Sequence, residues 1–333
     1  MKVVIRQVRG GSGVDVWAES LCKGIQKEGH VCNLDLCSGI YQFVPALAKF
    51  RKNHLVPDII QSNSWHASAF RGDVPLVVTE HLLVHDPVYT PYKTIPQKLF
   101  HRWIYRCERR SFGAADAVIC VSQYTRKKLE ESFGISGSVV IYNGIDTSLF
   151  TPAEPVCDTW DIPANKTVLF FAGNLSRRKG ADLLPAIMKE LGDNFVLLLA
   201  TGQKGTSLSS MNNIINIGHL DIARLVMAYN RCDLFLSASR LEGFGLSVAE
   251  AMACGKPVVA TNGSSLPELV VDGKGGLLCR MDDVKDFAEK IRYLADDENL
   301  RKEMGLFNRK RVEDLFTLEK MVNNYIRLYQ SLL

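Results

Sequence analysis

The feature that most constrains the fold is an apolar run, a glycine loop and an Ala-rich run in direct succession. The run from Asp233 to Ala238 is typical of a short buried strand. The run from Leu246 to Cys254 favours a helix, which Gly255 and Pro257 end. A buried strand joined by a glycine loop to a helix is the building unit of open parallel α/β sheets, where ligands bind beyond the carboxyl ends of the strands. The stretch therefore predicts an α/β fold with a ligand site at this loop.

The loop itself predicts a seat for a diphosphate. A Gly-x-Gly pair alone is weak evidence of phosphate binding. Here, however, the two glycines let the backbone approach a ligand, and the first free amides of the following helix point outward with the positive end of its dipole behind them. We expect the seat to consist of Gly243, Phe244, Gly245, Leu246 and Ser247.

Two glutamates flank this seat. Glu250 lies about one turn along the helix, at about 1.5 Å per residue, which is similar to the step from a nucleotide's diphosphate to its ribose. An ionised carboxylate only accepts hydrogen bonds, so it suits a vicinal diol. A lone Glu on a helix is more often a solvated surface charge, but this helix is apolar nearly all round, so a buried Glu250 needs a partner. Glu242 faces the other side of the phosphates, where a transferred sugar would lie.

The two acids and their surroundings resemble a known family. The pattern Glu242-x7-Glu250, with Gly-Phe-Gly-Leu after the first acid and Ala-Met-Ala-x-Gly-x-Pro-Val-Val-Ala-Thr after the second, closely resembles the retaining glycosyltransferases of family 4. The resemblance implies the GT-B fold, an α/β arrangement of two Rossmann-like domains facing each other across a cleft. It also implies that Glu250 holds the ribose of a nucleotide-sugar donor and that Glu242 orients the donor sugar.

The domain organisation follows from length, linker signals and this resemblance. A chain of 333 residues is long enough for two domains of ordinary size. Prolines and a lack of periodicity identify residues 151–155 as a linker. We expect an acceptor-side Rossmann-like domain over 1–150, a nucleotide-sugar-binding domain over 151–315, and a final helix over 316–333 that crosses back to the first domain.

Three cations stand where the second domain begins. Its expected first strand, 167–172, is followed by Gly173, then Arg177, Arg178, Lys179 and a helix expected from Ala181 to Leu191. Cations at the start of a helix are unfavourable, so an anion should sit there, and a donor diphosphate fits. The resemblance assigns Lys179 a catalytic role. Asn174 stands where the family has an arginine, and either Arg177 or Arg178 could replace it.

The chain opens with an expected strand over 2–8, a turn at Gly11-Ser12-Gly13 and a helix. This is not the dinucleotide fingerprint, because Val14 or Asp15 stands at the third glycine position. In the resembled family the corresponding loop lies under the donor's diphosphate. For Ser12 a plain tight turn explains the residue equally well.

A histidine follows the strand expected over 75–79. His81 matches a family histidine that touches the donor sugar, and we expect it to be catalytic. A satisfied structural histidine is the alternative. His66 and His85 are weaker candidates.

Two further turns of the second domain bear on the donor. The resemblance places His219 and Leu220 beside the base, which relatives contact mainly through backbone. Residues 262–268 fit a family turn, with Ser264 and Ser265 in place of two glycines.

Residues 92–112 are rich in aromatic side chains and cations. A basic aromatic helix can lie on an anionic membrane surface or hold an anionic acceptor. A core helix with a solvated basic face is an equal alternative. The cations of this region are Lys93, Lys98, Arg102, Arg106, Arg109 and Arg110.

Composition limits the partners. The formal net charge of +4 makes nucleic acid an unlikely partner on charge alone, and the nine scattered cysteines indicate reduced core thiols. No Cys-x2-Cys, His-x3-His or Asp-x-Asp grouping offers a metal site, so we expect no metal and no cofactor. Without a transmembrane run or signal peptide, the chain should be cytoplasmic, with peripheral membrane association through 92–112 as an open alternative.

The resemblance implies a retaining hexosyltransferase, and the residues of the two motifs fit a transfer without metal. The enzyme would move a sugar from a nucleotide diphosphate donor to a glycan or lipid-linked acceptor. A UDP-sugar is favoured over GDP-mannose as the donor. The alternatives are an epimerase or phosphorylase on the same fold and a non-catalytic nucleotide-sugar-binding subunit. The departures at Asn174, Ser264 and Ser265 keep the last of these open.

Overall fold

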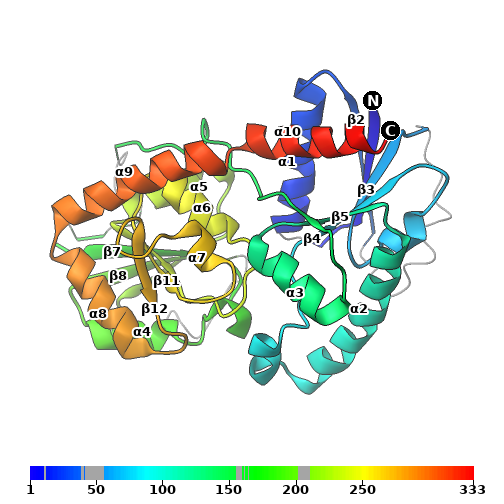
Figure 1. Ribbon diagram of the computed structural model, residues 1–333. Coiled ribbons are helices and arrows are strands. Elements are labelled where there is room, and N and C mark those ends of the chain that lie inside the picture. The colour runs from blue at the N-terminus through cyan, green and yellow to red at the C-terminus, as the bar shows by residue number, and fades with distance from the viewer. Residues whose placement is uncertain are drawn as a thin grey trace. The chain divides into compact units, whose positions relative to one another are not determined.

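The computed structural model describes residues 1–10, 13–38, 41, 56–154, 160, 162–163, 165–201 and 211–333. These residues form two compact units (Figure 1). Unit 1 comprises Met1–Gly144 together with Leu318–Leu333, and unit 2 comprises Ile145–Thr317. Each unit consists of a parallel sheet and the helices that cover it, so the expected α/β class is confirmed.

The described strands of unit 1 form a six-stranded sheet in the order β2-β1-β3-β4-β5-β6, with every neighbouring pair parallel. All five residues of β4 are buried, because a central parallel strand is covered on both faces. The strands are β1 (Lys2–Val8), β2 (Val31–Cys37), β3 (Ile59–Asn63), β4 (Leu76–Glu80), β5 (Ala117–Cys120) and β6 (Val139–Val140).

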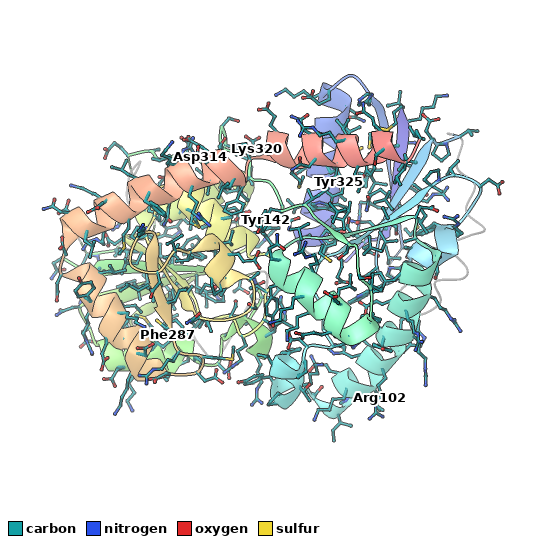
Figure 2. The ribbon with its side chains drawn as sticks, viewed as in Figure 1. Arg102, Tyr142, Phe287, Asp314, Lys320 and Tyr325 are labelled. Carbon is teal, nitrogen blue, oxygen red and sulfur yellow. The ribbon has the colours of Figure 1, made fainter. Side chains whose placement is uncertain are left out.

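Helices from both ends of the chain build unit 1. Tyr325 (Figure 2) and Tyr329 belong to the C-terminal helix and are fully buried. They reach the central strands, because their hydroxyls hydrogen-bond Thr79 at 3.0 Å and Gln61 at 2.9 Å. The helices are α1 (Gly13–Lys27), η3 (Ala67–Phe70), η4 (Pro87–Tyr92), α2 (Ile95–Ala114), α3 (Gln123–Phe133) and α10 (Leu318–Ser331).

Unit 2 repeats the arrangement with the strand order β12-β11-β10-β7-β8-β9, again parallel throughout the described strands. This order puts β7 beside β10 in the middle of the sheet, so the loops that follow these two strands leave the same edge side by side. The strands are β7 (Thr167–Ala172), β8 (Phe195–Ala200), β9 (Ile214–Gly218), β10 (Leu234–Ser237), β11 (Val258–Thr261) and β12 (Gly276–Cys279).

The helices of unit 2 differ from expectation at one point. The helix expected from Ala181 begins at Leu184 instead, since Gly180 ends a preceding 3-10 turn in the left-handed conformation and Pro185 fits a first helical turn. The helices are η5 (Arg177–Lys179), α4 (Leu184–Leu191), α5 (Ile222–Arg231), α6 (Leu246–Ala253), α7 (Leu266–Leu269), α8 (Val284–Ala295) and α9 (Glu298–Leu315).

Candidate functional site

The loop between β10 and α6 is buried almost throughout, from Ser239 to Gly245. Gly245 caps α6 with a φ of 105°, and a Cβ at this position would lie 3.1 Å from Leu269 and 3.2 Å from Leu266. Glycine is therefore required here for conformation and for space. Because Gly245 has no side chain to cap the helix, no capping side chain covers the Leu246 and Ser247 amides at the start of α6, and a ligand can use them.

Glu242 lies in this loop and meets two cations from the loop after β7. Its Oε1 is 2.6 Å from Lys179 Nζ, and its Oε2 is 3.3 Å from Arg178 Nη1. Arg178 also donates to the Leu241 carbonyl at 2.8 Å. Three residues that sequence analysis predicted for the site are thus brought together by the pairing of β7 with β10.

The charge balance of this cluster favours an anion. Burial alone would raise the pKa of Glu242, but the neighbouring Lys179 and Arg178 charges outweigh it and hold that pKa at about 2. Glu242 is therefore ionised at neutral pH and neutralises only one of the two cations. The surplus positive charge is available to a diphosphate.

The structure distinguishes the two arginines that sequence analysis left open. Arg178 is half-buried and reaches Glu242, whereas Arg177 is exposed. The turn that carries them is fixed by Ser176, whose Oγ accepts from Lys179 N at 3.3 Å, and by Gly180, whose φ is 69°. Gly180 packs directly against the residue that follows β10, and only glycine fits, because a Cβ at this position would lie 2.0 Å from the Ala238 carbonyl oxygen.

Glu250 stands one turn into α6, as expected, but it already has a protein partner. The Tyr229 hydroxyl donates to Glu250 Oε2 at 2.7 Å, and the Tyr229 ring is fully buried. The partner that a buried Glu250 needs is therefore supplied for Oε2 by the protein itself, through α5. Burial nevertheless raises the pKa of Glu250 to about 7, although Tyr229 and Lys179 act to lower it.

Sequence analysis missed the contribution of two serines. Ser264 Oγ accepts from Glu242 N at 3.1 Å, and Ser265 Oγ donates to the carbonyls of Glu242 at 3.1 Å and Phe244 at 2.9 Å. Ser264 does so with a φ of 51°, a conformation that favours glycine. The sequence signal for these hydrogen bonds was that serines stand where the family has glycines, because a hydroxyl in such a turn can hydrogen-bond the neighbouring backbone.

The residues expected beside the base lie farther along the sheet edge. His219 is exposed and Leu220 is buried, and both follow β9, which β8 separates from β7. Gly218 turns the chain there with a φ of 72°. The structure thus brings them to the same edge as Lys179 but not into its cluster.

His81 belongs to unit 1 and follows β4, as expected. Its ring meets the Trp17 ring edge-on with centroids 4.4 Å apart, and its buried Nε2 has no hydrogen-bond partner among the described residues. Burial lowers the pKa of His81 to about 3, so the imidazole is neutral and can exchange a hydrogen bond with a ligand. Gly13 begins α1, whereas Gly11 and Ser12 lie outside the described residues.

Of the weaker histidine candidates, both in unit 1, His66 is buried and His85 is half-buried. His85 Nε2 lies 2.8 Å from Glu108 Oε2, a contact that ties α2 to the segment after β4. His66 is 1% exposed, and burial lowers its pKa to about 4. The pairing of His85 favours its structural interpretation.

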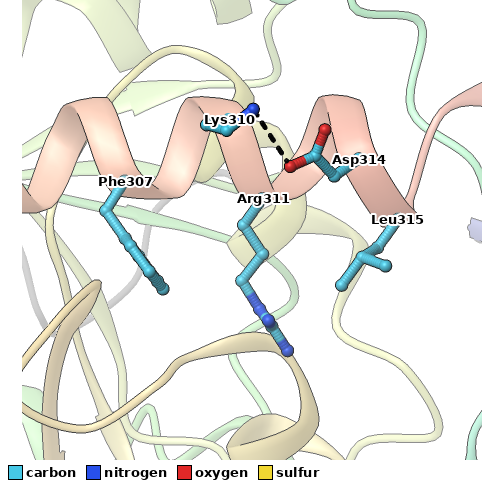
Figure 3. Close-up of a pocket in the computed structure, with 5 residues that line it drawn as sticks. All are labelled: Phe307, Lys310, Arg311, Asp314 and Leu315. Atoms are coloured by element: carbon cyan, nitrogen blue, oxygen red, sulfur yellow. Dashed lines mark ion pairs between the residues drawn. The ribbon is translucent and has the colours of Figure 1, made fainter.

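A groove on α9 is lined by none of the predicted site residues (Figure 3). It has a volume of about 380 Å³ and is lined by Phe307, Lys310, Arg311, Asp314 and Leu315. Arg311 donates to the carbonyls of Leu269 and Glu268 at 2.9 and 2.8 Å, which fastens α9 to α7. We assign this groove no ligand.

Other expectations concern cysteines, metals and membranes. The eight cysteines of the described residues are buried free thiols. Within the same residues no His, Cys, Asp and Glu side chains group as a metal site would require. No helix in the described part of the chain has the length and apolar character needed to cross a bilayer.

Comparison with known proteins gives two family matches. A family described as Glycosyltransferase Family 4 matches residues 14–149, and one described as Glycosyl transferases group 1 matches residues 158–311. An uncharacterised glycosyltransferase of Methanocaldococcus jannaschii is 30% identical over 236 residues, which are 66% of this chain and 60% of that protein. A D-inositol 3-phosphate glycosyltransferase of Corynebacterium aurimucosum is 30% identical over 283 residues, which are 74% of this chain and 66% of that protein.

Solved structures agree in fold. Sucrose-phosphate synthase from Thermosynechococcus elongatus matches with a TM-score of 0.87 and 19% identity, over 100% of this chain and 99% of that one. Anabaena HepE in complex with UDP-glucose matches with a TM-score of 0.77 and 19% identity, over 100% of both chains. The two Rossmann-like units define a protein of the GT-B fold class. The chain belongs to glycosyltransferase family 4, as its two acids and their surroundings predicted.

Proposed function

We propose that the chain is a retaining, metal-independent glycosyltransferase that takes a hexosyl group from a nucleotide diphosphate donor. The observation that carries the proposal is the convergence of Lys179 and Arg178 on Glu242, in the loop that leads into α6. Cations, free helix amides and an ionised acid at one sheet edge form a site for a leaving diphosphate on one side and a sugar on the other.

The residues supply what such a transfer requires. Its barrier lies largely in charge that appears on the leaving diphosphate, which Lys179, Arg178 and the first-turn amides of α6 can stabilise. Glu242 orients the donor sugar by accepting its hydroxyl hydrogens, and Glu250 accepts those of the ribose. A leaving phosphate oxygen takes the proton of the acceptor hydroxyl, so no separate general base is needed.

The family resemblance implies further contacts to the same donor. The neutral His81 imidazole would bind a hydroxyl of the sugar, and the turn at Gly11, Ser12 and Gly13 would lie near the diphosphate. The backbone at His219 and Leu220 would line the base. In this proposal the acceptor belongs to the N-terminal domain, for which we keep the predicted extent of residues 1–150.

A uridine donor is favoured over GDP-mannose. Support comes from the similar fold of HepE, which was solved with UDP-glucose. The acceptor would be a hydroxyl in glycan or glycolipid assembly, and the relative described as a D-inositol 3-phosphate glycosyltransferase is compatible with a hydroxylated acceptor.

A lipid-linked acceptor would bring the protein to an anionic membrane, and α2 has a suitable surface. Its buried side contains Ile104, Cys107 and Phe112, as a core helix with a solvated basic face would also have. Its exposed side carries Ile95 and Leu99 near the start and a line of arginines beyond them. Apolar side chains followed by cations suit the interface of anionic lipids. The exposed arginines are Arg102 (Figure 2), Arg106, Arg109 and Arg110.

The test begins with binding. Thermal unfolding is measured with UDP, GDP, ADP and their sugar conjugates, because a ligand that binds only the native state raises the melting temperature. We expect stabilisation by one nucleotide class, followed by transfer of its sugar to an acceptor. Glu242→Ala should abolish the transfer.

Three results would contradict the proposal. A chain that no nucleotide stabilises lacks the donor site. Release of sugar phosphate on addition of inorganic phosphate would indicate a phosphorylase. Binding without turnover against a broad set of acceptors and water would indicate a non-catalytic subunit.

A further inference from the structure

Arg240 is a buried cation for which the proposed chemistry has no direct use. Its side chain is 3% exposed and lies between two aspartates. Nη1 and Nη2 donate to the two carboxylate oxygens of Asp182 at 2.7 and 3.0 Å, and Nε donates to Asp282 Oδ1 at 2.6 Å. Two carboxylates neutralise the guanidinium, so Arg240 offers no net charge to a ligand. Its importance must lie in what it holds.

Arg240 also binds two consecutive carbonyls of the cationic turn. Its backbone N–H donates to the Arg178 carbonyl at 2.8 Å, and Nη1 donates to the Arg177 carbonyl at 2.5 Å. Fixing both carbonyls fixes the two peptide planes, and the direction in which the Arg178 and Lys179 side chains leave the backbone follows from them. The conformation of the turn that carries three adjacent cations is thus fixed by hydrogen bonds from a residue of the neighbouring loop.

The same residue stands two positions before Glu242 in the opposite loop. Arg240 therefore connects the turn that carries the cations directly to the loop that carries the acid. Gly180 and Ala238 bring these two segments into van der Waals contact, and such contact alone does not fix their register. A planar guanidinium with several donors in fixed geometry can do so.

We infer that Arg240 is a positioning residue for the diphosphate of the donor, which it does not touch itself. It holds Arg178 and Lys179 in the orientation that a diphosphate requires. The inference rests on the proposed function. It assigns Arg240 to the diphosphate subsite alone, since Glu250 is held by Tyr229 of α5 through a separate hydrogen bond.

This separation gives the test. The dissociation constants of uridine diphosphate and of uridine are measured by calorimetry for the parent chain and for Arg240→Gln, Arg240→Lys and Asp182→Asn. The readout is the ratio of the two constants, because a general loss of folding weakens both ligands alike and leaves the ratio unchanged. Arg301→Gln is the matched control, since Arg301 also anchors two carbonyls of unit 2, those of Leu294 and Ala295.

We expect Arg240→Gln to reduce the preference for the diphosphate by about tenfold or more, and Asp182→Asn by about threefold. Arg240→Lys should recover part of the preference, because it keeps the charge but not the fork. Arg301→Gln should leave the ratio unchanged.

The outcomes separate the inference from the proposed function. If the parent binds uridine diphosphate well and Arg240→Gln keeps the parent's ratio, the inference is wrong and the function stands. If Arg240→Gln does not fold, Asp182→Asn decides, and an unchanged ratio there overturns the inference. If the parent binds no nucleoside diphosphate of the panel, the proposed function itself fails.

Discussion

Lys179 faces the ionised Glu242 at 2.6 Å, yet its proposed role is to stabilise a second anion, the leaving diphosphate. Replacing it by methionine keeps the volume of the stem and removes the charge. We expect Lys179→Met to lower kcat for sugar transfer on the order of a hundredfold, as loss of one preorganised electrostatic contact does. Steady-state kinetics with the best donor of the panel measures this loss.

The control is a lysine of the same unit that lacks such a neighbour. Lys189 lies exposed on α4, and Lys189→Met should change kcat by less than about twofold. Equal losses in both variants would assign the effect to net charge rather than to the site.

Glu250 gives a prediction for pH. Its pKa is about 7, above the ordinary carboxyl value of 4.5, and a ribose diol donates best to the ionised form. Nucleoside affinity should therefore rise as pH increases through 7. Between pH 6 and pH 8 the ionised fraction grows about tenfold, and the affinity for uridine should follow it. Uridine is the right ligand because it carries no phosphate that titrates in this range.

Glu250→Gln supplies the comparison. It cannot ionise, so its uridine affinity should be flat over the same range. The free energy of unfolding should change with pH in the opposite direction to the uridine affinity. A raised carboxyl pKa means that the folded chain binds the proton more tightly than the unfolded chain does. The contribution of Glu250 to stability therefore decreases from pH 4.5 to pH 7. A parent whose uridine affinity does not change with pH would show that Glu250 is not the group that accepts the diol.

Much of the candidate site could be predicted from residue types and local spacing. Glu242 and the glycine-capped helix lie in one continuous motif and Lys179 in another, and in both motifs the start of a helix favours an anion. Arg240 and Tyr229 could not be found this way, because their roles depend on contacts between segments far apart in the sequence. A buried Tyr in an amphipathic helix gives the same pattern whether it packs or donates to Glu250.

At the scale of elements, the site depends on how closely the η5 turn approaches β10. Gly180→Ala would place a Cβ 2.0 Å from the Ala238 carbonyl oxygen at a φ of 69°. We expect this variant to unfold at a lower urea concentration, because its free energy of unfolding falls by about 2 kcal/mol or more. It should also lose most of its affinity for the diphosphate. The second effect follows because η5 must move away from Glu242.

Gly192→Ala is the control that separates backbone strain from the steric clash expected for Gly180→Ala. Gly192 follows α4 with a φ of 83°, and a Cβ there would meet nothing within 4 Å. It should cost about 1–3 kcal/mol from backbone strain, because a φ of 83° with a ψ of −167° is a conformation nearly restricted to glycine, and it should leave nucleotide binding intact. If the two variants bound uridine diphosphate equally well, the approach of η5 to β10 would not position the cations.

At the scale of the whole molecule, the chain folds its last helix with its first residues. The strand-turn-helix order of both sheets could be predicted, because parallel strands are continuous apolar runs and helices between them have clear limits. The residues that α10 would meet could not be predicted from periodicity, since an amphipathic helix shows that it has a buried face but not what covers it. In the structure α10 covers α1, and Tyr325 and Tyr329 lie in the core of unit 1.

The contact between Gly24 and Val322 tests the packing of α10 on α1, because this packing decides whether Gly24→Ala lowers or raises the free energy of unfolding. A Cβ on Gly24 would lie 2.3 Å from Val322 Cγ2, so Gly24→Ala should destabilise the chain by about 1–2 kcal/mol if α10 packs on α1. Without that packing, Gly to Ala inside a helix should stabilise it by about 0.5–1 kcal/mol. Gly113→Ala in α2, where a Cβ meets nothing within 4 Å, should show this stabilisation.

The double variant Gly24→Ala with Val322→Ala completes the argument. Val322→Ala alone removes a buried side chain and should cost about 2 kcal/mol, but in the double variant the new methyl group fills part of the space that Val322 leaves. The two losses, measured by urea unfolding, should therefore sum to more than the loss of the double variant. Strict additivity would mean that the residues do not meet, and the C-terminal helix would then not complete the N-terminal unit in solution.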